Sequence, residues 1–222
     1  LGSLLPVDIV ELFAPWRHEP SGGPGTVHNI LLSDTMDVHS HFASLSADIR
    51  AGNASWWDRS IGAGIPSSKA GFSPVLWGYL LVPAWYAPGL AAGVRTLVAA
   101  GLTYGLVRSL GAGKHAAVIS GVAYALSGFM IGWAGWPQSN TAAFLPGVFW
   151  AAEALVRRSS WRSACGLGLA SSAMIVSNFP VVTGYGILVG AGYALARLVQ
   201  RRKQSGPWPV VVRDRSLRAF LG

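Results

Sequence analysis

The chain has 222 residues, of which 51% are hydrophobic and only 12% charged, about half the charged share of ordinary soluble domains. Its 28 glycines and 10 tryptophans are typical of closely packed transmembrane helices with aromatic anchors at the membrane boundary. A single cysteine excludes an intrachain disulfide framework and a cysteine-based metal site. These numbers predict an all-α polytopic membrane protein.

The net charge of +8 is divided unevenly along the chain. Residues 1–58 hold seven acidic and two basic residues, a net charge of −5, whereas residues 59–222 carry a net charge of +13. The bases of the second part gather in short clusters between apolar runs, as in cytoplasmic loops of membrane proteins. The charge therefore indicates topology rather than nucleic-acid binding, and it places residues 1–85 on the extracytoplasmic side.

Residues 1–87 are predicted to form a turn-rich extracytoplasmic loop that contains one amphipathic helix over about 34–51. Gly52 is suited to end this helix, and Ser33 or Asp34 to cap its start. We expect the helix to lie at the membrane surface rather than cross it. Its apolar stripe is Val38, Phe42, Leu45 and Ile49, and another face carries Asp34, Asp37, His41, Ser44 and Asp48.

Residues 72–87 are aromatic and apolar, and Pro74 and Pro83 break them, which predicts a segment that re-enters the membrane. Residues 88–203 are predicted to form a transmembrane bundle of about five spans, each near the length that crosses the hydrocarbon. The expected spans are 88–108, 115–135, 141–156, 163–177 and 181–199. Basic clusters occupy every second connection, and the connections at 136–140 and 177–185 are uncharged. Residues 204–222 are predicted to be a basic cytoplasmic segment, and we expect the chain to be a fragment of a longer protein.

Three stretches carry a family resemblance. HNILLSDTMDVHSHFASL (28–45) and DIRAGNASWWDRSIGAGIPSSKAGFSPVLWGYLLVP (48–83) resemble the first outer loop of the bacterial YfhO-like membrane proteins, and VISGVAYALSGFMIGW (118–133) resembles their third-span region. Asp34 lies at the family's aspartate position, but Val38 to His41 stand where the family has Gln-Tyr. The second block of the motif is matched by Gly52, Trp57, Gly62, Gly64 and Pro66.

The resemblance implies a GT-C-like transmembrane helix bundle with a large first outer loop that contains membrane-surface helices and a catalytic aspartate. Such a protein is an inverting membrane glycosyltransferase of the bacterial plasma membrane. It moves a sugar from a polyprenyl-phosphate donor to a cell-envelope polysaccharide or lipid acceptor outside the membrane. Asp34 is then the residue expected to remove the proton from the acceptor hydroxyl.

The candidate site residues each have an alternative interpretation. Asp34 can be a helix cap instead of a base, and Asp37 with His41 can hold a divalent cation or form a local ion pair, which we favour. Arg95 lies inside the first clear span, where a charge is costly, so we expect it to bind the donor phosphate, to pair with an acid of the outer loop, or to extend to the membrane boundary. Trp57 is a candidate for stacking on a sugar ring, or it is an aromatic anchor at the membrane boundary.

Two structural expectations concern the bundle itself. Glu153 precedes Arg157 by four residues, so a structural ion pair within one helix is predicted. Eight glycines are expected to mark close helix contacts: Gly101, Gly105, Gly121, Gly128, Gly132, Gly186, Gly190 and Gly192.

Two other classes of function fit the same pattern. A transporter or flippase for a lipid or polar solute predicts broken helices around a site at the membrane midplane, and Asn178-Phe179-Pro180 is a candidate break. A non-catalytic subunit of an envelope-assembly complex predicts that Asp34 and Asp37 are dispensable.

Overall fold

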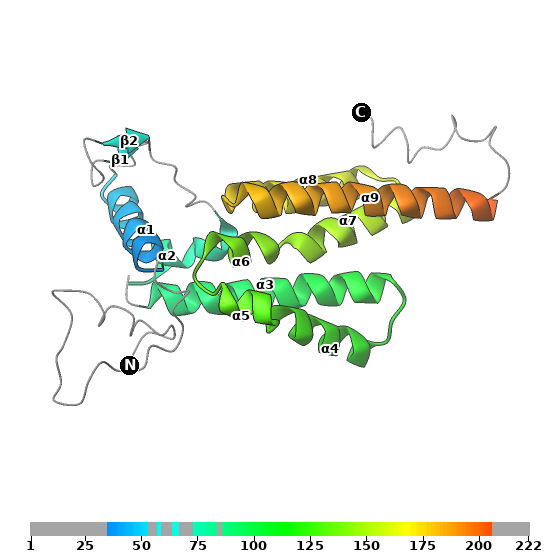
Figure 1. Cartoon of the computed structure of the whole chain (residues 1–222), viewed down its shortest axis with the longest axis horizontal. Helices are drawn as coiled ribbons and strands as arrows, with labels where there is room; N and C mark the ends of the chain where they lie inside the picture. Colours follow the sequence, from blue (N-terminus) through cyan, green and yellow to red (C-terminus); the bar gives the residue numbers. More distant parts are fainter. Residues whose placement is uncertain (1–34, 53–56, 59–63, 67–72, 84–85, 206–222) are drawn as a thin grey trace.

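The computed structural model describes residues 35–52, 57–58, 64–66, 73–83 and 86–205, and these are mostly helical (Figure 1). The side chains of residues 35–40, 57–58, 65–66 and 204–205 lie outside the description. The longer helices lie side by side, and the chain's first helix, α1, stands at one end of them (Figure 1). The helices of eight or more residues are α1 (Thr35–Arg50), α3 (Ala87–Ser109), α4 (Lys114–Ala125), α7 (Leu145–Arg157), α8 (Trp161–Val176) and α9 (Pro180–Ser205).

The predicted amphipathic helix is confirmed as α1. Phe42 and Leu45 are 5% and 6% exposed, and Ile49 packs against the same cluster, so three members of the predicted stripe face the core. The helix ends as expected, because Gly52 has a φ of 74°, a left-handed conformation that glycine adopts without strain. The apolar stripe of α1 is therefore covered by other parts of the chain.

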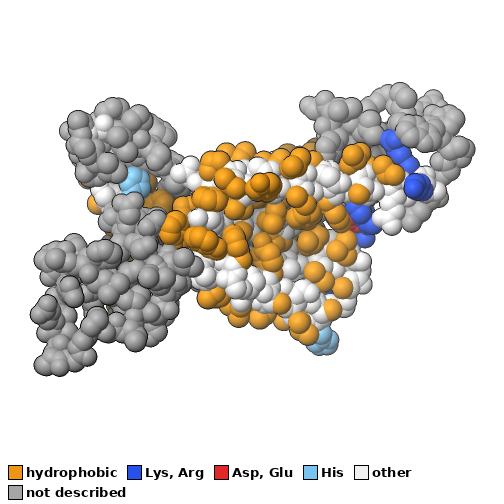
Figure 2. All heavy atoms as spheres, viewed as in Figure 1, with side chains coloured by type: hydrophobic (Ala, Val, Ile, Leu, Met, Phe, Trp, Pro, Cys, Tyr) orange, Lys and Arg blue, Asp and Glu red, His pale blue; other side chains and the backbone are white. Residues whose placement is uncertain are grey.

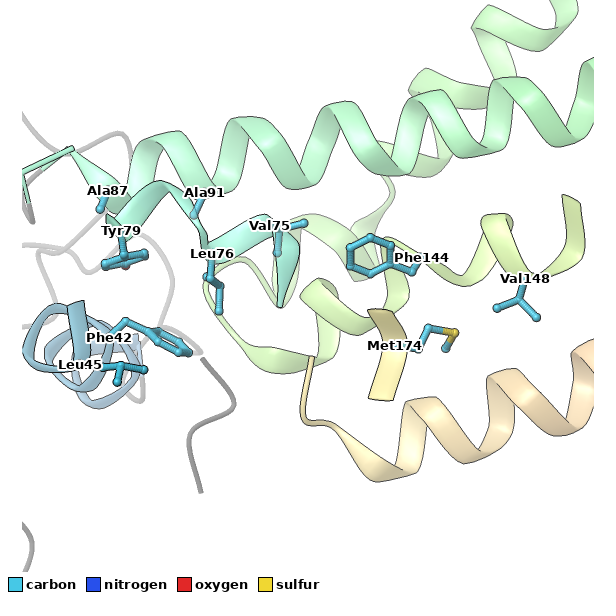
Figure 3. Close-up of a cluster of buried hydrophobic side chains, with 10 residues drawn as sticks. All are labelled: Phe42, Leu45, Val75, Leu76, Tyr79, Ala87, Ala91, Phe144, Val148 and Met174. Carbon is cyan, nitrogen blue, oxygen red and sulfur yellow. The ribbon is translucent and has the colours of Figure 1, made fainter. Parts of the chain in front are cut away.

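The segment that covers α1 is the predicted re-entry segment. It forms the 3₁₀ helix η4 (Pro74–Leu76) and the short helix α2 (Gly78–Leu81), and it stops before α3 begins. Figure 3 shows Phe42 and Leu45 of α1 beside Tyr79 and Leu76, in a cluster that continues to Met174. The Arg50 guanidinium donates to the carbonyl oxygens of Tyr79 and Val82, both at 2.9 Å, and so ties the end of α1 to α2.

The motif that matched the second block of the resemblance contains a small hairpin that the all-α prediction missed. Strand β1 (Trp57–Asp58) pairs antiparallel with β2 (Ile65–Pro66), with Trp57 opposite Pro66. Gly64, immediately before β2, has a φ of 98°, which a residue with a side chain rarely adopts. The glycine at this position is therefore a backbone requirement of the hairpin.

The helices α3 and α4 form a tight antiparallel hairpin. Gly121 of α4 lies so close to α3 that a Cβ atom there would approach the Ala100 carbonyl oxygen to 2.7 Å. After α4 the helix breaks at Ser127, whose extended backbone (ψ 156°) starts the short helix α5 (Gly128–Gly132). The predicted second span, 115–135, thus contains a break in its second half.

The predicted third span, 141–156, coincides with α7 and with the last two residues of α6 (Pro137–Ala142), which otherwise occupies the predicted turn, and the two helices are separated at Ala143 and Phe144. Helix α7 packs against α3, α8 and α9, so it is the central helix of the bundle. The glycine prediction is half confirmed, because a Cβ atom would clash at Gly105, Gly121, Gly186 and Gly190 but meets nothing within 4 Å at Gly101, Gly128, Gly132 and Gly192.

Three stretches of the described chain are long and apolar enough to cross a membrane: Ala87–Ser109, Lys114–Gly132 and Pro180–Lys203. Helices α7 and α8 occupy the positions of the third and fourth predicted spans, but their 13 and 16 residues make them only about 20 and 24 Å long, against a hydrocarbon thickness of about 30 Å. Figure 2 shows hydrophobic side chains over the middle of the helices and Lys and Arg at the end where α9 finishes. We call this the basic end of the bundle.

Candidate functional site

Arg95, the charged residue that the sequence places within the first clear span, is buried in α3. Arg95 is 6% exposed and lies about 12 Å along the helix from Ala87. Its Nη1 donates to the hydroxyl oxygen of Ser139 in α6, over 3.2 Å. No ion pair joins Arg95 to an acidic side chain that the structure describes. A buried guanidinium with one neutral hydrogen-bond partner still favours an anion nearby, because its charge is not balanced within this part of the chain.

The partner of Arg95 is held by a second set of hydrogen bonds. The Ser139 hydroxyl accepts from Arg95 and donates to the carbonyl oxygen of Trp133 at 2.7 Å, with the Trp136 carbonyl at 3.1 Å as the alternative acceptor. The two indole rings pack edge to face, with centroids 5.3 Å apart and an interplanar angle of 85°. The hydroxyl that binds the guanidinium is therefore itself fixed by the backbone of the turn between α5 and α6.

Helix α6 is unusually polar for a buried segment. Gln138, Ser139, Asn140 and Thr141 are all buried, at 8%, 0%, 4% and 0% exposure. The Oε1 atom of Gln138 and the Oγ1 atom of Thr141 are buried without a hydrogen-bond partner in the described structure. Such an atom costs about 1–3 kcal/mol, so these groups make α6 a costly segment to bury and a candidate for binding a polar ligand.

The sequence predicted only one half of this site. Arg95 stands out because it is a charge within an apolar run, but residues 136–140 were expected to be an outer turn. The sequence signal for α6 is the run of uncharged polar residues after Pro137, but solvent-exposed turns have the same composition. What could not be predicted is that this run forms a buried helix against α3.

The other predicted site residues are placed only in part. Asp34 lies outside the described residues, and Asp37 belongs to α1 but its side chain is not described. His41 is half-buried in α1, with its ring edge to face on Phe42 at 5.9 Å, and it makes no hydrogen bond to Arg95. Trp57 lies in β1, and its side chain is likewise outside the description.

A metal site at α1 is not seen among the side chains that the structure describes. No group of three His, Cys, Asp or Glu side chains gathers there at distances suited to one ion. The pairing of Asp37 with His41, as cation ligands or as an ion pair, remains a prediction, because the Asp37 side chain is outside the description.

A second buried charge lies at the basic end of the bundle. The predicted pair of Glu153 and Arg157 is confirmed, with Arg157 Nε 2.7 Å from Glu153 Oε1. The larger contribution comes from α9: Arg197 donates through Nε and Nη2 to the two carboxylate oxygens at 2.8 and 2.7 Å, and the Tyr193 hydroxyl donates at 2.8 Å. Glu153 is 0% exposed and fully bonded, so this carboxylate joins α7 to α9 and is not free for chemistry.

Comparisons with known proteins add no further assignment. A scan against protein-family models found no matching family, and searches of curated proteins and of solved structures found no match.

Proposed function

We propose that this chain is part of a GT-C-type membrane glycosyltransferase of the bacterial plasma membrane. It transfers a sugar from a polyprenyl phosphate to a cell-envelope polysaccharide or lipid on the extracytoplasmic side. The proposal rests on the likeness of residues 28–83 to the first outer loop of the YfhO-like proteins and on the buried cation of α3. In this proposal the five helical positions after residue 87 all cross the membrane.

The observation that carries the proposal is the environment of Arg95. The guanidinium is buried, has no acidic partner among the described residues, and is oriented by Ser139. It lies closer to the start of α3 than to its end, and the start of α3 is the end next to α1. A lipid phosphate at the outer boundary is an anion of the right charge and depth for this group, and arginine binds phosphate oxygens in a bidentate manner.

The reaction assigns separate roles to the two charged groups. An acceptor hydroxyl oxygen attacks the anomeric carbon, the bond between that carbon and the phosphate oxygen breaks, and the configuration inverts. Asp34 accepts the hydroxyl proton, and Arg95 stabilises the negative charge that develops on the departing polyprenyl phosphate. Asp37 and His41 lie near the acceptor side and orient Asp34, and Trp57 stacks on the sugar.

The test is sugar transfer in membranes by the full-length protein and its variants. Arg95→Gln should lower the transfer rate by about 10²-fold or more, as the loss of one preorganised donor to a developing charge does. Arg108→Gln is the matched control, because it removes the same charge from the other end of α3, where Arg108 binds the Ala112 carbonyl. Asp34→Asn should abolish transfer and Asp48→Asn should not; full activity of Asp34→Asn would exclude the mechanism.

A transporter or flippase is the second candidate, and the broken helices favour it. Breaks at Ser127 and at Ala143–Phe144 lie in two neighbouring spans beside the buried polar helix α6, an arrangement that transporters use around a substrate. Purified protein in liposomes separates the two candidates. Flipping of a lipid without sugar transfer, lost in Arg95→Gln, would favour the transporter.

A further inference from the structure

A second feature, distinct from the Arg95 site, is an apolar pocket between α3, α7 and α8. Its volume is about 760 Å³, which is within the usual range for small-molecule and lipid sites. Its walls are small or apolar side chains, including Gly101 and Leu102 of α3, Trp150 and Ala151 of α7, and Gly166 and Ala170 of α8. We call it the α3–α7–α8 pocket.

The polarity of this pocket is confined to one end. Among the described residues that line it, Arg162 and Ser163, in the first turn of α8, are the ones with a charged or hydroxyl side chain. They lie at the basic end of the bundle, beside the loop that joins α7 to α8. An elongated apolar space with a cation at one end matches a molecule with a hydrocarbon chain and an anionic head.

Arg162 is available to such a head. Its side chain is exposed, it makes no ion pair or hydrogen bond with the residues that the structure describes, and its guanidinium carbon lies 5.7 Å from the Trp161 ring centroid. Arginine and tryptophan together at a helix start are typical of the membrane boundary. By contrast, Arg157 and Arg197 at the same end are already bonded to Glu153.

We propose that the α3–α7–α8 pocket binds an anionic phospholipid of the leaflet at the basic end. One acyl chain lies along the apolar walls, and the phosphate contacts Arg162 with the Ser163 hydroxyl beside it. Basic pockets between transmembrane helices on the cytoplasmic side bind anionic headgroups by the same chemistry. This site is separate from the donor site at Arg95 and does not depend on the glycosyltransferase proposal.

The test is lipid retention by the purified full-length protein in detergent, measured by native mass spectrometry. The probes are phosphatidylglycerol and phosphatidylcholine with identical acyl chains. The wild-type protein should retain phosphatidylglycerol preferentially. Arg162→Gln should weaken that retention by about fivefold, the factor for one basic side chain near a membrane surface.

Two matched controls separate this site from general surface charge. Arg158→Gln removes the same charge four residues earlier, at an exposed position outside the pocket, and should leave retention unchanged. Gly101→Leu fills the pocket from a position where a Cβ meets nothing within 4 Å, and should reduce retention of both lipids. Gly168→Leu makes the same change outside the pocket, also without a contact, and should not.

Each other outcome overturns the proposal. Equal retention of the two lipids by the wild-type protein excludes selection by charge. Equal losses in Arg162→Gln and Arg158→Gln show a diffuse surface effect rather than a site. Unchanged retention in Gly101→Leu shows that the acyl chain lies elsewhere.

Discussion

The connection between α7 and α9 through Glu153 makes a quantitative prediction about stability. Glu153→Gln keeps the shape of the side chain but removes the charge that two arginines and Tyr193 share. Breaking a buried ion pair costs about 3–5 kcal/mol. We expect about 3 kcal/mol, because the Arg197 side chain is 31% exposed and water can solvate it when its partner is lost.

The two arginines should differ in their contributions. Arg157 is 49% exposed and lies one turn from Glu153 on the same helix, so Arg157→Gln should cost less than about 1 kcal/mol. Arg197→Gln should cost about 2–3 kcal/mol, because it removes two charge-assisted hydrogen bonds between separate helices.

The measurement is reversible unfolding in mixed micelles, with double-mutant cycles of Glu153→Gln against each arginine variant. The coupling energy with Arg197 should exceed that with Arg157. Equal coupling energies, or a Glu153→Gln variant as stable as the wild type, would refute the assignment of this carboxylate as the link between α7 and α9.

Three further predictions concern packing and backbone geometry. Gly121→Leu should destabilise the α3–α4 hairpin by about 1–3 kcal/mol, because its Cβ would lie 2.7 Å from the Ala100 carbonyl oxygen. Gly132→Leu is the control: a Cβ there meets nothing within 4 Å, so the free energy of unfolding should change by less than about 0.5 kcal/mol. Phe42→Ala should expose the backbone of α1 to hydrogen exchange without melting the bundle, because its ring joins α1 to Tyr79 (centroids 5.7 Å apart) and its removal costs about 3 kcal/mol. Asn178 has a φ of 61°, so Asn178→Val should lower the melting temperature by straining the turn between α8 and α9. Asn178→Gly should keep the backbone conformation and the melting temperature of the wild type. Equal melting temperatures of the valine and glycine variants would contradict this prediction.

Helices were predictable because their signals are local. The stripe from Phe42 to Ile49 repeats at helical spacing, and the expected range 34–51 differs from Thr35–Arg50 by one residue at each end. The long apolar runs likewise gave both ends of α3 and the start of α9 to within one residue, but α9 continues through the basic residues to Ser205, six residues beyond the predicted end. The break at Ser127 was not predictable, because no proline or charge marks it in the sequence.

Partners across the bundle were not predictable, because they depend on how the helices pack. Glu153 meets Arg157 four residues away, as expected, but it binds Arg197 from 44 residues away. Half of the eight glycines make the expected close contacts, and the sequence does not distinguish them from those that face open space. In the same way, Arg95 was recognised as unusual, but its partner Ser139 lies in a segment expected to be a turn.

The bundle contains two arginines with different partners, Arg197 beside a buried carboxylate and Arg95 beside a hydroxyl group, and the difference can be tested. Arg197 is bonded to a buried carboxylate, so Arg197→Leu should destabilise the protein by leaving Glu153 without its main partner. Arg95 has no acidic partner among the described residues and one hydroxyl contact, so its charge is a net cost to folding. The free energy of unfolding of Arg95→Leu should therefore equal that of the wild type or exceed it by up to about 2 kcal/mol. The same variant should lose sugar transfer. If Arg95→Leu destabilised the protein as much as Arg197→Leu, Arg95 would be a structural residue and its assignment to phosphate binding would be wrong.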